Sequence, residues 1–202
     1  MNIILLLDYI GVFVFAMSGV LAASDKKMDL FGGVIIAFVT ALGGGTLRDL
    51  LLNTEIGWIN HTEYIYVVLG GATFALLFKK VTKPIRNGMF LFDTIGISIF
   101  TILGVQKALF HDVPLEVAVI FGVMTATFGG VVRDILSNQI PLIFRQEIYA
   151  TACMFGAIVY VCLDKLEMNE PLNTAISGAV IIGIRTLSVI KKLRLPIING
   201  RL

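Results

Sequence analysis

The sequence predicts an all-α polytopic membrane protein, with seven transmembrane helices in an inverted three-plus-three repeat followed by a seventh helix. Three observations predict this fold class. Apolar residues make up 57% of the 202 residues, charged residues only 15%, and the mean hydropathy is +0.90, whereas a soluble domain carries about 25% charged residues. Seven apolar runs have lengths suited to crossing a bilayer. The chain also matches itself when it is shifted by 85 residues, a shift that aligns Asp8 with Asp93.

The seven apolar runs define the predicted elements. A bilayer core of about 30 Å requires roughly 20 mainly apolar residues per helix, and about 17 to 25 are tolerated. The predicted spans are residues 3–23, 31–53, 62–78, 89–109, 114–136, 148–163 and 172–190, of which the third and sixth are short. The connections are brief and contain charged residues, proline and glycine. The whole chain, 1–202, is therefore predicted to be a single transmembrane domain.

Lysine and arginine residues are distributed unevenly between the two sets of loops. Eleven lie on one predicted side of the membrane, and only Lys107 and Lys165 lie on the other. Because basic residues concentrate in cytoplasmic loops, the amino terminus is predicted to lie outside the cell and the carboxyl terminus in the cytoplasm. A minority interpretation makes one basic group a site for anionic lipid head groups: Lys79, Lys80, Lys83 and Arg86.

The repeat relates residues 1–82 to residues 88–165 and leaves 171–202, the seventh helix and a cytoplasmic tail, outside. The matched residues include polar and charged positions: Asp8 with Asp93, Thr40 with Thr125, Gly44 and Gly45 with Gly129 and Gly130, and Arg48 and Asp49 with Arg133 and Asp134. Each unit contains three predicted spans, an odd number, so the second copy must cross the membrane in the opposite sense. Inverted repeats of this kind typify transporters and channels, whose halves meet around a pathway near the midplane.

The repeated charged residues are expected to form two clusters. Asp8, Arg48 and Asp49 all lie near the outer ends of their predicted spans. We therefore expect these three side chains to lie together, and we call them the first cluster. By the inverted symmetry, the second cluster gathers near the inner end: Asp93, Arg133 and Asp134. A charged residue inside a bilayer costs at least about 2.5 kcal/mol, so it needs a partner or water. Two interpretations stay open, an ion-paired lock between helices and an acidic ring that attracts cations.

Between the clusters lie small and hydroxyl-bearing residues. Five hydroxyls either bind a partly dehydrated cation or pack and bond to their own helix: those of Thr40, Thr125, Ser18, Thr94 and Ser98. The glycines either let two helices approach closely or break the helices and expose carbonyl groups; they are Gly43, Gly44, Gly45, Gly129 and Gly130.

Other side chains and motifs indicate no second activity. Trp58, Tyr64 and Tyr66 are expected to form an interfacial aromatic belt, and Arg185 is expected to reach towards the interface. The chain contains no nucleotide-binding loop, metal-ligand spacing or activated nucleophile, which predicts that it is not an enzyme and has no cofactor or metal. The net charge of +2, without a basic stripe, argues against nucleic-acid binding.

These motifs resemble the trimeric intracellular cation (TRIC) channel family, in its bacterial branch, which is also labelled a glycine-transporter domain family. The resemblance is carried by the run Gly43 to Asp49, by its copy Gly129 to Asp134 and by the opening Asp8 to Gly19. It implies a homotrimer in the cell inner membrane, with a pore in each protomer lined by the second and fifth spans, kinked at the glycines. The implied permeant ions are potassium and sodium. In the second copy, Phe128 replaces the first glycine, so the two halves need not bend equally.

Two functions remain open at this stage. A potassium-permeable channel would pass cations down their gradient. A secondary transporter of glycine or another small amino acid would instead saturate, and Arg48 or Arg133 beside the helix termini would hold the substrate carboxylate. The resemblance favours the channel.

Overall fold

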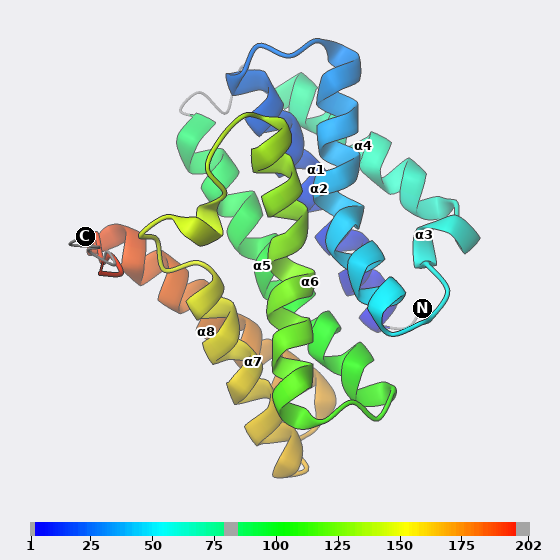
Figure 1. The fold of residues 1–202 in the computed structure, drawn as a ribbon, viewed down its shortest axis with the longest axis vertical. Helices are drawn as coiled ribbons and strands as arrows, with labels where there is room; N and C mark the ends of the chain where they lie inside the picture. The colour runs from blue at the N-terminus through cyan, green and yellow to red at the C-terminus, as the bar shows by residue number, and fades with distance from the viewer. Residues whose placement is uncertain (1–2, 79–84, 197–202) are drawn as a thin grey trace, which may run out of the picture.

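The computed structural model describes residues 3–78 and 85–196, and the regular secondary structure in these ranges is helical (Figure 1). The elements are α1 (Ile3–Asp25), α2 (Leu30–Leu51), α3 (Gly57–Asn60), α4 (Glu63–Phe78), α5 (Ile85–Phe110), α6 (Leu115–Leu136), the 3-10 helix η1 (Leu142–Phe144), α7 (Ala150–Lys165) and α8 (Glu170–Ile190). The predicted all-helical class is confirmed. The side chains of the basic group at residues 79–86 lie outside the described part of the chain.

Five of the described helices are long and apolar enough to cross a membrane: α1, α2, α5, α6 and α8. The other two candidates, α4 and α7, have 16 residues each. At 1.5 Å per residue they are about 24 Å long, shorter than the hydrocarbon core of about 30 Å. The structure therefore confirms that the third and sixth predicted spans are short, and seven complete crossings remain a prediction.

The helices α2 and α6 end in matching turns. After α2 the chain turns at Asn53, which has a φ of 53°, and after α6 it turns at Asn138, which has a φ of 52°. Asparagine tolerates this left-handed backbone conformation better than most residues, so it suits the end of a helix. The turns lead into the short helices α3 and η1, which are the equivalent elements of the two repeats.

The glycines allow α2 and α6 to cross in direct backbone contact. A Cβ atom added at Gly44 would lie 2.0 Å from the carbonyl oxygen of Thr125, and one added at Gly129 would lie 2.2 Å from that of Thr40. Only glycine fits at these two points. Both helices continue without interruption through their glycines, so the predicted break in the helices is not present. Close packing, the other interpretation, describes Gly44 and Gly129.

The central helices α1, α2, α5 and α6 pack against one another, and α4 and α7 flank them on opposite sides (Figure 1). The helix α8 packs on α5 and α7. The larger apolar core includes Phe15 and Phe100, whose ring centroids are 5.2 Å apart across the contact between α1 and α5. This arrangement places the carboxyl-terminal ends of α2 and α6, which carry the Arg-Asp pairs, at opposite ends of their crossing.

Candidate functional site

The first cluster is centred on the carboxylate of Asp49. Arg48 Nε and Lys107 Nζ each donate to Asp49 Oδ1 over 2.8 Å. The backbone N–H of Gly57, at the start of α3, donates to the other oxygen over 3.2 Å. Two cations therefore neutralise this carboxylate and three donors hold it, and its side chain is only 3% exposed. A lysine from the second repeat thus completes a cluster that otherwise belongs to the first.

Asp8 lies in the same cluster with a different partner. The hydroxyl of Tyr64, on α4, donates to Asp8 Oδ2. Among the described residues, Asp8 makes no ion pair with Arg48, although both line the same cavity. The structure therefore brings Asp8, Arg48 and Asp49 together as predicted, but the arginine pairs with its own neighbour.

A cavity of about 590 Å³ opens beside the first cluster. Six ionic side chains line it, with four carboxylates against two cationic groups: Asp8, Asp49, Glu55, Glu170, Arg48 and Lys107. His61 and His111 also contribute to its wall. The side chain of Lys107 is 30% exposed, so solvent reaches the charged groups. Counted over these six side chains, the lining has a formal surplus of two negative charges.

The second cluster is sealed in the protein. Arg133 Nη1 donates to Asp93 Oδ1 over 2.7 Å and is 2.9 Å from Ser18 Oγ. Arg133 Nε donates to Asp134 Oδ1 over 2.9 Å, and the N–H of Leu142 donates to Asp134 Oδ2 over 3.0 Å. The Arg133 side chain is 0% exposed. The second cluster therefore has the geometry of an ion-paired lock between helices. The first cluster faces a cavity, as an acidic ring that attracts cations would.

Three buried atoms of the second cluster have no hydrogen-bond partner among the described residues. They are Asp93 Oδ2, Arg133 Nη2 and the hydroxyl oxygen of Tyr149. The guanidinium of Arg185, on α8, lies 4.9 Å from the centre of the Tyr149 ring and 5.1 Å from that of Phe90. Arg185 is 2% exposed, so the expectation that it reaches towards the interface is wrong. It is held by cation–π contacts with these two rings, by a hydrogen bond of 2.9 Å to the carbonyl of Ile148 and by an ion pair of 3.6 Å with Glu147.

The threonines and glycines lie between the clusters, at the crossing of α2 and α6. Thr40 Oγ1 donates to the carbonyl of Ile36 over 2.6 Å, and Thr125 Oγ1 donates to that of Phe121 over 2.7 Å. Their hydroxyl protons are thus used within their own helices, as the packing interpretation predicts. Gly44, at the crossing, lies about one helical turn before Arg48, which lines the cavity. The crossing therefore lies between the cavity and the second cluster.

Sequence reasoning missed several side chains of the two clusters. Tyr64 was assigned to an aromatic belt, yet it is buried and bonds Asp8. Its signal was available, because Tyr64 and Tyr149 match at the repeat offset. Lys107 carried no such signal, since its equivalent is Ala22. Ser18 was expected to offer its hydroxyl to a cation, and the structure places it against Arg133 instead.

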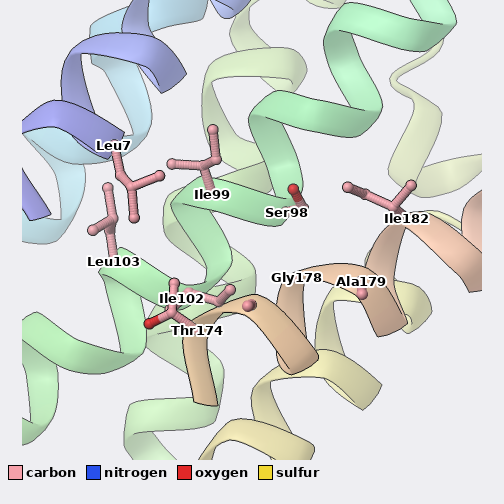
Figure 2. Close-up of a pocket in the computed structure, with 10 residues that line it drawn as sticks. Leu7, Ser98, Ile99, Ile102, Leu103, Thr174, Gly178, Ala179 and Ile182 are labelled. Carbon is pink, nitrogen blue, oxygen red and sulfur yellow. The ribbon is translucent and has the colours of Figure 1, made fainter. Parts of the chain in front are cut away.

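A smaller cavity of about 270 Å³ lies between α1, α5 and α8 (Figure 2). Figure 2 shows the aliphatic side chains of Leu7, Leu103 and Ile182 around it, with the hydroxyls of Ser98 and Thr174 at its wall. No ionic side chain lines it. Its chemistry does not suit an ion. A cavity of about 290 Å³ beside α2 and α6 also has no ionic side chain in its lining. The cavity at the first cluster, which has several, is therefore the candidate site.

Comparison with known proteins agrees with this architecture. A family model described as a glycine transporter matches the chain twice, at residues 5–80 and 90–165. The chain also superimposes on a TRIC trimeric intracellular cation channel orthologue from Rhodobacter sphaeroides with a TM-score of 0.91, at 35% identity over 96% of this chain and 100% of that one. The chain belongs to the TRIC channel family. The two matched ranges correspond to the two halves that align with each other in the sequence.

Three further proteins are similar to this chain over most of its length. A structure described in connection with conductance through TRIC cation channels matches with a TM-score of 0.87 and 32% identity, covering 98% of both chains. The inner membrane protein YadS of Escherichia coli is 36% identical over 96% of this chain and 98% of its own length. A membrane protein of Vibrio cholerae is 40% identical over 89% of this chain and 75% of its own. The chain is therefore a member of a family of membrane proteins.

Proposed function

We propose that the chain is a monovalent cation channel, permeable to potassium and sodium, with a pore inside each protomer lined by α2 and α6. The observation that carries the proposal is the pair of matched charged clusters on either side of the crossing of these helices, of which one faces a solvent-accessible cavity. The site residues proposed for this path are Asp8, Thr40, Gly43, Gly44, Gly45, Arg48, Asp49, Asp93, Thr125, Gly129, Gly130, Arg133 and Asp134.

The charge of the cavity supports a cation rather than an anion. Four carboxylates outnumber two cationic side chains in its lining. A concave site with an excess of one sign raises the local concentration of the opposite ion, because its low-dielectric walls focus the field. The matched proteins are described as cation channels, which supports the same sign of ion.

We further propose that the repeat is inverted across the membrane and that seven helices cross it, with the amino terminus outside and the carboxyl terminus in the cytoplasm. In Figure 1, α1 runs upward from the end marked N, whereas its equivalent α5 runs downward. This opposite course supports inversion. The excess of lysine and arginine in one set of loops supports the orientation.

The descriptions of the relatives support a proposal on assembly and location. The matched orthologue is described as trimeric, and we propose that this chain is also a homotrimer. YadS is described as an inner membrane protein, and we propose the same membrane for this chain. Contact with membrane lipid follows from the apolar outer helix faces, where large hydrophobic side chains are exposed: Phe31, Leu77, Phe110 and Ile120 among them.

A second candidate function is transport of glycine or another small amino acid. The description of the family model favours it. The cavity also holds two cationic groups, Arg48 and Lys107, which would bind a carboxylate, and four acidic groups, one of which would bind an ammonium.

Purified protein in liposomes separates the two functions. Potassium flux and uptake of radiolabelled glycine are measured in the same preparation. We expect potassium flux that rises with concentration without saturating at low levels, and no accumulation of glycine. Saturable glycine accumulation without a potassium current would establish the transporter instead.

A further inference from the structure

The smaller cavity, of about 270 Å³, adjoins the larger one at the first cluster. Residues of α1, α5 and α8 line both, and Leu103 belongs to both linings. Along α8 the lining residues are one helical turn apart, because Glu170 lines the larger cavity and Thr174 and Gly178 line the smaller one. Side chains four residues apart lie on the same helix face. The two cavities are therefore consecutive parts of one site, and we call the smaller part the apolar groove.

The wall of this site changes from charged to apolar towards the middle of the helices. On α5, Lys107 lines the larger cavity and Ile99 lines the apolar groove. On α8, Glu170 lines the larger cavity and Ile182 the groove. Both helices are apolar and long enough to cross a membrane. A molecule that fills both parts therefore needs a polar head near the helix ends and an apolar tail nearer their middle.

The carboxylates of the larger cavity favour a cationic head. Arg48 and Lys107 both pair with Asp49, so their charges are already matched to one carboxylate. In the part of the chain that the structure describes, Asp8 and Glu170 make no ion pair. A positive head group in this cavity would thus meet two carboxylates that no other cation holds, in a concave site that focuses their field.

Gln106 lies at the boundary between the two parts of the site. Its Nε2 donates to Glu170 Oε1 over 3.1 Å and to Thr174 Oγ1 over 3.3 Å. Its Oε1 is buried and has no hydrogen-bond partner among the described residues. Because buried polar atoms normally find a partner, this oxygen is a free acceptor. A primary ammonium, which has three N–H donors, suits both this oxygen and the carboxylate beside it.

The volume of the apolar groove suits one alkyl chain. A water molecule takes about 30 Å³ of liquid, and a methylene group is similar in size, so the groove of about 270 Å³ holds roughly nine such groups. Two small residues, Gly178 and Ala179, leave this space free (Figure 2). The side chain of Ile182 is 39% exposed, so the groove is open to the surrounding lipid and a chain can enter from the membrane.

We propose that this site binds a primary alkylammonium with a single chain of roughly ten carbons. The ammonium lies beside Gln106 and Glu170 in the larger cavity, and the chain lies in the apolar groove. The inference goes beyond the cation path proposed above and does not require it. Where that path exists, the bound head group occupies the cavity and lowers the flux of potassium.

Photolabelling of the protein in liposomes tests the site directly. The probe is decylammonium with a diazirine near the end of its chain, and mass spectrometry locates the label. We expect the label on the parts of α5 and α8 that line the groove, and we expect excess unlabelled decylammonium to remove most of it. Two competitors should fail at the same concentration: methylammonium, which has no chain for the groove, and decyl sulfate, whose head has the opposite charge.

Two glycines of α8 provide matched variants. A Cβ at Gly178 would lie 3.5 Å from Ile102 Cδ1, an ordinary contact, and the rest of a leucine side chain would fill the groove. A Cβ at Gly183 would meet nothing within 4 Å, and Gly183 does not line the groove. We expect Gly178→Leu to weaken labelling, and to raise the decylammonium concentration that halves potassium flux, by about tenfold. Gly183→Leu should change neither.

Label spread over all the apolar helices, or label that excess decylammonium does not remove, would overturn the proposal, because it would show partition into lipid alone. Equal competition by decyl sulfate, or equal labelling of Gly178→Leu and Gly183→Leu, would overturn it too. If Gly178→Leu does not fold, the competition on the wild type decides. If the wild type passes no potassium but the labelling is as expected, the channel function fails and the binding site stands.

Discussion

The two charged clusters have the same four side chains in the same order, yet one faces a cavity and the other is sealed. Asp8, Arg48, Asp49 and Tyr64 recur in the second repeat as Asp93, Arg133, Asp134 and Tyr149. Both Arg-Asp pairs have nearly the same geometry, with Nε to Oδ1 distances of 2.8 and 2.9 Å. The residues shared by the repeats therefore set the local bonding and leave the accessibility of each cluster undetermined.

Residues outside the repeated set account for the difference. Lys107 donates to the first cluster, and its equivalent, Ala22, has no such group. Ser18 lies 2.9 Å from Arg133 in the second cluster, and its equivalent is Leu103. Arg185 comes from α8, which has no counterpart in the repeat. A duplicated unit thus acquires two different ends through a few unmatched side chains.

The largest expected effect is on folding of the sealed cluster. Arg133→Gln should lower the free energy of unfolding by about 3 to 5 kcal/mol, because it leaves two buried carboxylates without their cation. Arg48→Gln should cost about 1.5 kcal/mol, because Asp49 keeps Lys107 as a partner and the cavity admits water. Thermal unfolding in detergent micelles measures both. Equal losses would mean that the two clusters do not differ in burial as described.

Substitutions on the two sides of the helix crossing are expected to lower the stability of the protein by similar amounts. Gly44→Ala and Gly129→Ala should each destabilise the protein by about 1 to 3 kcal/mol, because the new Cβ would overlap a carbonyl oxygen of the other helix. Gly43→Ala is the matched control, since its Cβ would lie 3.6 Å from Gly129 Cα, an ordinary contact. Unfolding in detergent again provides the measurement. If Gly43→Ala were as harmful as the other two, the crossing would not lie where we place it.

A smaller effect is expected from the lysine that only the first cluster has. Lys107→Met removes a positive charge from the wall of the cavity and should raise potassium conductance about twofold at low ionic strength. The increase should shrink in high salt, because screening weakens the field of an exposed charge. Single-channel recording compares it with Lys165→Met, an exposed lysine at the end of α7. A lower conductance in Lys107→Met would contradict the electrostatic role given to this cavity.

Much of the fold could be predicted from the sequence, because the patterns that indicate it are local or occur in both halves of the chain. Apolar runs predicted the helices, and the depth of each charged residue along its span, together with the repeat, predicted that Asp8 and Arg48 belong to one cluster. The shortness of α4 and α7 was also predicted. These features follow from hydropathy and duplication, which need no knowledge of side-chain packing.

Other features depend on packing that a sequence does not encode locally. Glycines suit both a broken helix and a close crossing, and only the position of Thr125 against Gly44 decides between them. Arg185 has the sequence context of an interfacial residue, but the rings of Phe90 and Tyr149 hold it inside. The choice between arginine and tyrosine as the partner of an aspartate likewise depends on residues from other helices.

The central claim is that cations pass through the protomer along a path guarded by these acidic clusters. The most direct test is the reversal potential in a planar bilayer under a potassium chloride gradient, for wild type and for Asp8→Asn. Our account predicts a wild-type potential close to the potassium equilibrium potential, and a shift towards zero in Asp8→Asn. A wild-type potential close to the chloride equilibrium potential, or the same potential in both proteins, would contradict it.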